Sequence, residues 1–432
     1  MTSLWTKTAR LPEFPPLAGD TKTEVLVIGG GIAGILCLWS LRQTGVDALL
    51  VESGRICGGV TGNTTAKLTA QHGLIYHRLV REFDLDIAQR YLQANLEALE
   101  RYQALCRSMD CDFQEKDAFV YARHDRAKLV EEVDALRKLG YPAELCSTIP
   151  LPFPVAGAVK FPKQGQFHPL KFLGALAQGL PIHEHTKVLE FLPGGVVTDR
   201  GRISARNIIT ATHFPFLNKH GSYFLKQYQH RSYVLALEHA PDVGGMYVDE
   251  DEKGLSFRNQ NGLLLLGGGS HRTGKQGGSW QELSEFAQKY FPNANEVARW
   301  ATQDCMTLDG VPYIGQYSRR TPHLYVATGF QKWGMTTAMV AAGLLTDLIC
   351  GRKNPYAGVF SPSRSMLRPQ LAANAASAAL HLLTPTRPRC PHLGCALKYN
   401  PQEHSWDCPC HGSRFSETGE LLDNPATDGK KM

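Results

Sequence analysis

Residues 24–34, EVLVIGGGIAG, decide the fold of this chain. The apolar run at residues 24–28 has the length and composition of a buried parallel strand, and it leads into three consecutive glycines. Residues 32–43 follow a helical pattern, and residues 48–52 form a second short apolar run. This order predicts a strand–helix–strand unit at the start of an α/β fold.

The glycines of this stretch have the spacing G-x-G-x-x-G at the predicted strand-to-helix turn. Gly29 allows the tight turn, Gly31 lets the backbone approach a pyrophosphate, and Gly34 lets the helix pack closely on the strand. Glu52 ends the second predicted strand, where it can accept hydrogen bonds from an adenosine ribose. The spacing alone also arises by chance, so its position between strand and helix carries the argument. The combination predicts a site for FAD or NAD.

Length and composition set the scale of the whole chain. Its 432 residues, 43% hydrophobic and 20% charged, are too many for one ordinary core. The net charge of +6 is spread along the chain without a basic run, so we expect no nucleic-acid partner. The sequence shows neither an export signal nor an apolar stretch long enough for a transmembrane segment, and we therefore expect a cytoplasmic protein.

Apolar periodicity predicts the elements that follow. Residues 76–109 and 126–139 repeat apolar side chains at helical spacing, and we expect these helices to interrupt the nucleotide fold and pack on it. The pair Asn261-Gly262 predicts a type I′ hairpin in the strand-rich residues 232–269. Further predicted elements are strands at residues 188–191, 208–211 and 324–327, a helix at 335–350, and a linker at 361–388 containing one Ala-rich helix.

Three segments resemble the FAD-dependent oxidoreductases of the D-amino-acid-oxidase and glycine-oxidase type. They are residues 52–72 (ESGRICGGVTGNTTAKLTAQH), 300–315 (WATQDCMTLDGVPYIG) and 328–345 (TGFQKWGMTTAMVAAGLL). The resemblance implies FAD as the cofactor, bound by a Rossmann-like domain that is interleaved with an antiparallel-sheet substrate domain. Besides the glycine motif and Glu52, the residues that it implies for FAD binding are Ser53, Thr61, Thr65, Val188, Gly329, Gly334, Met335 and Thr336.

A separate NAD(P)H domain is not expected. The nearest candidate for a second glycine motif, at Gly267 and Gly269, has Arg272 in place of the third glycine.

Three residues are candidates for roles at the flavin and in the substrate pocket. In the oxidases that this chain resembles, an arginine five residues before the aspartate of D-G-x-P pairs with the substrate carboxylate; counting back from Asp309, this sequence has Asp304 (309 − 5 = 304). An anion there would repel a carboxylate and favour an amine, unless Asp304 is a loop residue that points away from the flavin. Tyr247 is a second candidate pocket residue or a core aromatic. Cys305 is a flavin-tethering thiol or an ordinary buried cysteine.

The C-terminal tail holds a second constellation. Four of the eleven cysteines lie in the motifs CPHLGC (residues 390–395) and CPCHGS (residues 408–413). Two loops that each present a thiolate and an imidazole suit a [2Fe-2S] cluster in which one iron takes both thiolates and the other both histidines. Zinc is the competing interpretation, because a Cys2His2 set also suits a tetrahedral zinc ion. The predicted ligands are Cys390, His392, Cys408 and His411.

These motifs resemble the Rieske proteins of the cytochrome bc complexes. The resemblance implies a disulfide between Cys395 and Cys410, and a hydrogen bond from Ser413 to a bridging sulfide. Phe415 stands where the high-potential respiratory proteins have tyrosine, and one hydrogen bond fewer should lower the reduction potential. Residues 390–432 are too few for a complete Rieske domain, so we expect the cluster loops to dock on the flavoprotein body.

The sequence thus predicts an α/β protein in three parts: FAD-binding and substrate domains at residues 1–360, a linker at 361–388, and a small all-β Rieske-type tail at 389–432. We expect a FAD-dependent dehydrogenase that oxidises a small substrate, with an amine favoured, and passes electrons through the cluster to an external one-electron acceptor protein. Two alternatives stay open. One is a reductase in which an external donor feeds the cluster and then the flavin, and the other is a non-enzymatic redox sensor or electron-transfer module.

Overall fold

The computed structural model describes residues 2–275, 277–385 and 388–430, and a mostly parallel sheet carries the glycine turn. Its order is β16-β17-β10-β1-β2-β7, with β9 pairing β10 and β8 pairing β9. The predicted strand–helix–strand unit is confirmed as β1 (Thr21–Ile28), α2 (Ile32–Gln43) and β2 (Ala48–Val51). The other strands are β7 (Ile182–His183), β8 (Val188–Leu192), β9 (Gly195–Thr198), β10 (Gly201–Thr210), β16 (Tyr313–Gln316) and β17 (Leu324–Thr328).

Helix α9 (Gly334–Ile349) packs against α2 and forms the centre of the core together with the parallel sheet. Every residue from Met335 to Ala342 in α9 is buried, which explains why this helix is apolar on all sides. The helix begins shortly after β17, as the sequence predicted.

The helical run predicted at residues 76–109 is interrupted once. It forms α3 (Tyr76–Glu82) and α4 (Leu85–Cys106), because the Asp84 side chain accepts a hydrogen bond from the backbone N–H of Ile87 at 2.7 Å and so caps a new helix. Helix α4 packs on α9, in agreement with the expectation that these helices cover the nucleotide fold. The second predicted helix is α5 (Arg126–Lys138).

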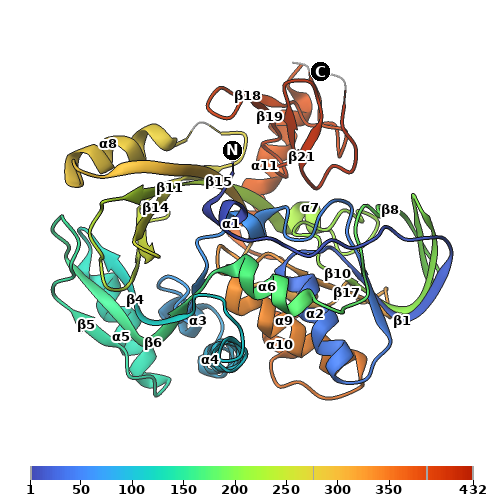
Figure 1. The fold of residues 1–432 in the computed structure, drawn as a ribbon, viewed down its shortest axis with the longest axis horizontal. Helices are drawn as coiled ribbons and strands as arrows, with labels where there is room; N and C mark the ends of the chain where they lie inside the picture. Colours follow the sequence, from blue (N-terminus) through green and yellow to red (C-terminus); the bar gives the residue numbers. More distant parts are fainter. Residues whose placement is uncertain (1, 276, 386–387, 431–432) are drawn as a thin grey trace.

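A second sheet, with the order β15-β11-β14-β13-β12-β4-β6-β3, lies beside the first (Figure 1). The predicted hairpin is present, since Asn261 (φ +47°) and Gly262 (φ +79°) join β13 to β14 in the left-handed conformations that a type I′ turn requires. The strands are β3 (Lys67–Leu68), β4 (Gln114–Ala122), β5 (Glu144–Cys146, paired with β6), β6 (Gly157–Gln166), β11 (Gln227–Glu238), β12 (Met246–Asp249), β13 (Ser256–Gln260), β14 (Leu263–Arg272) and β15 (Asn295–Thr307). Pairs β11–β14 and β11–β15 are antiparallel, whereas β12 runs parallel to β4.

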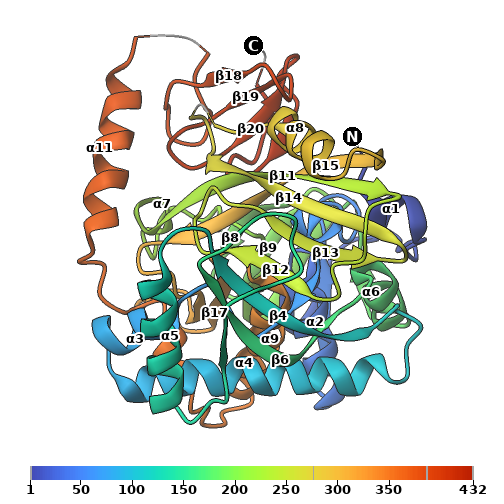
Figure 2. The ribbon, with the colours of Figure 1, turned by 90° about the vertical axis from the view of Figure 1, so that its left-hand side faces the viewer.

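The tail forms a separate antiparallel sheet of β18 (Lys398–Asn400), β19 (Ser405–Asp407), β20 (Arg414–Ser416) and β21 (Leu421–Asp423). In Figure 1 this sheet lies above β11 and β15, and Figure 2 shows α11 (Pro369–Leu383), the Ala-rich helix expected in the linker, running along one side of the molecule toward it. The remaining helices are α1 (Leu4–Thr8), α6 (Pro169–Ala177), α7 (Tyr223–Lys226), α8 (Trp280–Tyr290) and α10 (Ala357–Phe360).

Among the helices that the structure describes, none combines the length and the apolar character needed to cross a bilayer.

Candidate active site and metal centre

The glycine turn between β1 and α2 leaves no room for side chains. A Cβ atom on Gly34 would lie 1.8 Å from the carbonyl oxygen of Gly29, and one on Gly29 would lie 2.6 Å from the carbonyl oxygen of Ala211. Gly29 also has a φ of +108°, which favours glycine. The turn therefore exposes backbone N–H groups at the start of α2, where a pyrophosphate could bind.

Glu52 holds this turn together. Its Oε2 accepts a hydrogen bond from the Gly30 backbone N–H at 2.7 Å, and its Oε1 accepts one from the Gly54 N–H at 2.8 Å. Thr61 also holds the turn, because its Oγ1 accepts a hydrogen bond from the backbone N–H of Ile32 at 3.0 Å. These hydrogen bonds fix the orientation of both side chains.

A cavity of about 880 Å³ extends from this turn to the N-terminus of α9 and the β11–β15 sheet. That volume suits a dinucleotide with a small substrate beside it. Most of the residues predicted from the sequence line this cavity: Gly29, Gly31, Glu52, Ser53, Thr61, Thr65, Val188, Asp304, Gly329, Gly334 and Met335.

Three predicted residues lie elsewhere. Tyr247 is a core aromatic, the second of the two interpretations given above, and not a pocket residue: it is buried, stacks on Phe119 and donates its hydroxyl to the carbonyl of Val243 at 3.0 Å. Thr336 is 1% exposed and donates to the Thr69 carbonyl at 3.1 Å, and Gly34 lies under the turn as a packing residue.

Asp304 faces the cavity from β15, where it pairs with His230 of β11. Burial raises the pKa of its carboxyl above the ordinary value, although the charge of Lys332 opposes this effect. Lys332 lies in the loop before α9 and its own pKa is lowered by burial. Both Gln331 (φ +54°) and Lys332 (φ +69°) have left-handed backbones, a strain typical of functional loops.

Sequence reasoning missed a lysine in this cavity. Lys67 is only 9% exposed, and its Nζ donates to Thr65 Oγ1 at 3.2 Å. Burial, with a contribution from the charge of Arg258, lowers its pKa to about 7. Its place in the motif TGNTTAK, next to the predicted flavin contacts, is the signal that could have revealed it. Cys305 also lines the cavity, and burial raises the pKa of its thiol to about 12.

The four predicted metal ligands come together in the tail. Cys390 and Cys408 are 2% and 0% exposed, and a hydrogen bond from Cys408 lowers the pKa of Cys390 to about 7. The rings of His392 and His411 stand at 90° to one another with centroids 4.9 Å apart. The two thiols thus lie together and the two imidazoles lie together, which is the pairing that a cluster with one thiolate-bound and one imidazole-bound iron needs.

The nitrogen atoms of the two histidines fit metal binding. His392 Nε2 bonds to Asn218 Oδ1 at 3.0 Å, and the backbone of Phe224 is a hydrogen-bond partner of His411. The Nδ1 atoms of both rings are buried and lack a hydrogen-bond partner among the residues described. Burial lowers the pKa of His392 to about 4, and burial together with His392 lowers that of His411 to about 3. Both rings are therefore neutral at pH 7, with a free lone pair for iron.

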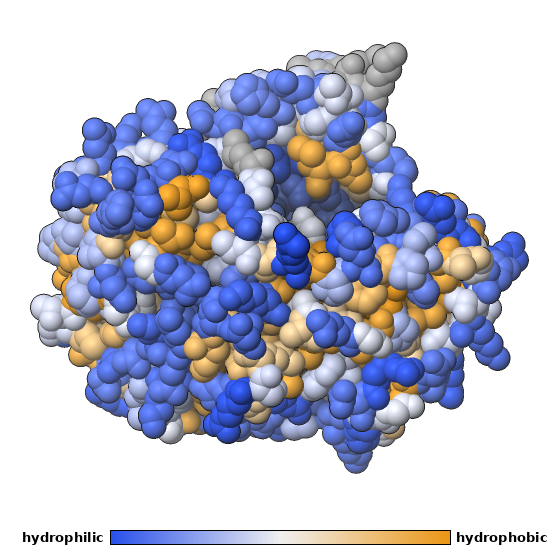
Figure 3. Space-filling model, viewed as in Figure 1, coloured by the Kyte–Doolittle hydropathy of each residue, from blue (hydrophilic) through white to orange (hydrophobic). Residues whose placement is uncertain are grey.

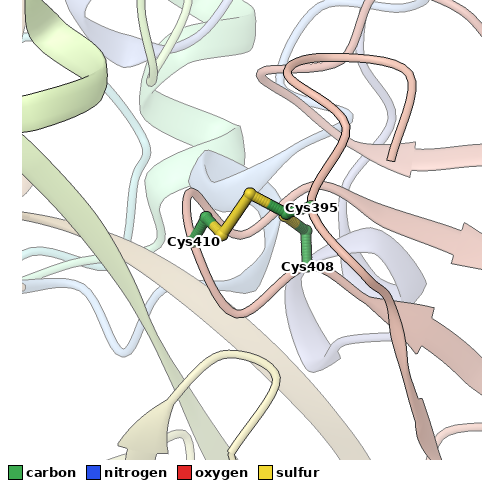
Figure 4. A group of neighbouring side chains, drawn as sticks. All are labelled: Cys395, Cys408 and Cys410. Atoms are coloured by element: carbon green, nitrogen blue, oxygen red, sulfur yellow. A yellow bond between two sulfur atoms is a disulfide. The ribbon is translucent and has the colours of Figure 1, made fainter. Parts of the chain in front are cut away.

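A disulfide joins the two cluster loops. Cys395 and Cys410 are bonded through their sulfur atoms, with Cα atoms 6.7 Å apart (Figure 4). Cys408 lies beside them, all three sulfurs being within 4.8 Å of one another. Because Cys395 and Cys410 are bonded to each other, Cys408 is the cysteine of this trio whose thiol is free to bind a metal.

The cluster loops dock on the body, as the small size of the tail led us to expect. Gln229, Arg231 and Tyr233 occupy one face of β11 and all bond to the tail. On the opposite face Ser232 and Val234 line the cavity, and the ring of Tyr233 reaches it as well. Residues 421–424, 426 and 427 of the tail line it too, and the surface in Figure 3 is hollowed where the tail meets the body. Ala426 also packs in one apolar cluster with Cys390 and Cys408, so the cavity and the metal centre share a wall at Ala426.

Comparisons with known proteins define the class. The chain belongs to the FAD dependent oxidoreductase family (DAO), which matches residues 24–348, and the Rieske [2Fe-2S] domain matches residues 382–431. The chain is therefore an α/β enzyme with FAD and a [2Fe-2S] cluster as cofactors, and the zinc alternative is not retained.

Individual members of these families are similar to this chain to different degrees. The chain is 35% identical to YhfW of Bacillus subtilis (strain 168), whose name describes a Rieske 2Fe-2S iron-sulfur protein, over 98% of this chain and 95% of that protein. Gamma-glutamylputrescine oxidoreductase of Escherichia coli (strain K12) is 24% identical, over 78% of this chain and 86% of that protein. Glycine oxidase from Geobacillus kaustophilus shares the fold, with a TM-score of 0.67 and 21% identity over 80% of this chain and 99% of that structure.

Proposed function

We propose that this enzyme is a dehydrogenase that oxidises a small amine and passes the electrons from FAD through the Rieske cluster to an external one-electron acceptor protein. The observation that carries the proposal is the shared wall, since residues 421–427 of the cluster-binding tail include lining residues of the same cavity as the glycine turn. FAD takes two electrons from a substrate, whereas the cluster carries one at a time. The two electrons from each substrate thus reduce two equivalents of the acceptor.

The site residues have separate roles in this proposal. Gly29, Gly31 and Glu52 would hold the nucleotide half of FAD, and the N-terminus of α9 at Gly334 and Met335 would stabilise negative charge on the reduced ring. Cys390, His392, Cys408 and His411 would hold the cluster. Residues 1–360 then form the catalytic body, 361–388 a linker and 389–432 the cluster unit.

An amine is the substrate class that the cavity favours. Asp304 stands where the related oxidases carry a cation for a carboxylate, and its raised pKa would let it take a proton from a bound ammonium group. Asp251, in the turn after β12, adds a second carboxylate to the cavity lining, which also carries Lys67 and Lys332. The relative named gamma-glutamylputrescine oxidoreductase supports the same class.

The test is anaerobic stopped-flow absorbance with a panel of amines, N-methyl amines and hydroxy acids. An amine should bleach the flavin, and a one-electron reduced cluster should then be seen by EPR. Asp304→Asn should weaken amine reduction of the flavin about tenfold, and the exposed control Asp242→Asn should not. If no substrate bleaches the flavin while a reduced carrier protein does, the reductase direction replaces this proposal.

A further inference from the structure

One side chain connects the cluster loop to the cavity. Gln229 of β11 is 1% exposed, and its Nε2 donates to the backbone carbonyl of His411 at 2.8 Å and to that of Asn424 at 3.0 Å. Two carbonyl acceptors fix the orientation of the amide, because only its NH2 group can donate. The amide oxygen therefore faces the other way.

That oxygen meets a histidine of the cavity wall. Gln229 Oε1 lies 2.9 Å from Nε2 of His213, and His213 lines the cavity with Asp304 and Thr328. Since Oε1 can only accept, Nε2 of His213 must carry the proton, which leaves Nδ1 with the lone pair. A continuous chain thus runs from the backbone of a predicted cluster ligand, through Gln229, to a side chain at the cavity.

The tail is shaped for this contact. Gly412 follows His411, has a φ of +85°, and would place a Cβ atom 2.6 Å from Cβ of Gln229. Any larger residue would push the loop away from β11. The close approach exists only because position 412 is a glycine.

We propose that Gln229 is the positioning residue that couples the two cofactor sites, by holding the cluster loop at a fixed distance and orientation from the cavity through His213. A rigid hydrogen-bonded chain in a buried site fixes the geometry between two reacting centres. This inference rests on the proposed function, in which FAD and the cluster exchange electrons. Neither Gln229 nor His213 was singled out by the sequence motifs.

The structure offers a matched control in Gln303 of β15. It is also 1% exposed, and its Nε2 donates to the Gly412 carbonyl at 2.8 Å, so that it holds the same loop. Its Oε1, however, accepts from Thr273 Oγ1 at 3.0 Å and not from a histidine of the cavity. Gln229→Met and Gln303→Met each remove one contact to residues 408–413 at similar side-chain volume, and the first also removes the contact to Asn424 and the chain to His213. His213→Leu breaks the chain alone and leaves both contacts of Gln229 to the tail in place.

The experiment uses the full-length protein with both cofactors. Flavin is reduced by a light pulse with EDTA, and the rate of cluster reduction is followed by absorbance and freeze-quench EPR. Hydrogen exchange of residues 408–413 is measured in parallel, because it reports loop docking independently of electron transfer. We expect both variants to loosen the loop similarly, and Gln229→Met to slow cluster reduction about tenfold more than Gln303→Met. His213→Leu should match Gln229→Met, and combining the two should add little.

The outcomes separate the two proposals. If the wild-type protein transfers no electrons between flavin and cluster, the proposed function fails. If the wild type transfers electrons and the two glutamine variants slow transfer equally, Gln229 is only a loop anchor and this inference is overturned.

Discussion

Arg231 of the flavoprotein body and Glu403 of the tail form a buried ion pair. Nε of Arg231 donates to Oε1 of Glu403 at 2.8 Å, and the two side chains are only 8% and 7% exposed. Arg414 donates to the same carboxylate at 2.9 Å, and Tyr233 adds its hydroxyl. This group of charges explains how so short a tail stays seated on the β11–β15 sheet.

Glu403→Gln should therefore release the tail. Removing the negative charge leaves the buried Arg231 with only the more distant carboxylate of Asp423, 3.8 Å away, which costs about 3 kcal/mol. We expect faster proteolysis within residues 388–430 and an earlier thermal unfolding step. The control is Glu417→Gln, because Glu417 is an exposed tail residue whose ion pair with His404 is solvent-exposed. Equal stability of the two variants would contradict the assigned role of the buried pair.

The Arg231–Glu403 ion pair should make the docking of the tail on the body depend on pH. Burial alone would raise the pKa of Glu403, but the hydrogen bond and charge of Arg231, together with Arg414, lower it to about 2 from its ordinary 4.5. A depressed carboxyl pKa contributes stability above the unfolded value, and this stability is lost as pH falls from about 4.5 toward 2. Tail protection measured by hydrogen exchange should decline over that interval. In Glu403→Gln the decline should be smaller, and an unchanged profile would show that other groups control it.

Replacement of a cluster ligand tests the metal centre. Cys408→Ser should abolish the iron-sulfur EPR signal, because it removes one of the two free thiols that converge in the tail. Flavin absorbance should remain, since the glycine turn lies between β1 and α2 and is held by Glu52 and Thr61, all outside the tail. Cys350→Ser is the control, as Cys350 is a partly exposed cysteine at the end of α9. Retention of a normal signal in Cys408→Ser would exclude this ligand set.

Gly34→Ala tests the nucleotide turn. The added Cβ would fall 1.8 Å from the Gly29 carbonyl oxygen, so the turn must open, at a cost of about 3 kcal/mol. We expect purified protein with little FAD and a lower melting temperature. Gly358→Ala is the matched control, because a Cβ there would meet open space. Full FAD content in Gly34→Ala would mean that the turn does not position the cofactor.

Local sequence patterns alone determined several elements of the fold. The strand–helix–strand unit, the Asn261-Gly262 hairpin and α9 all form where the sequence predicted, because apolar spacing and positive-φ residues act over a few neighbours. The metal-ligand motifs CPHLGC and CPCHGS are likewise defined by the spacing of their cysteines and histidines along the chain. The helical pattern at residues 76–109 did not reveal where the chain breaks, since the cap at Asp84 divides it into α3 and α4.

Only the tertiary structure decided how the two sites meet. Tyr247 does not line the cavity, because its strand directs that side chain into the core. Lys67 lines the cavity although the sequence motifs did not predict it. Gln229 and Arg231 reach the tail because β11 directs alternate side chains to opposite faces, and both residues lie on the face that meets the tail. Glutamine and arginine are common on any strand. Their partners in the tail lie 182 and 172 residues away along the chain, and folding alone brings those partners within hydrogen-bond distance.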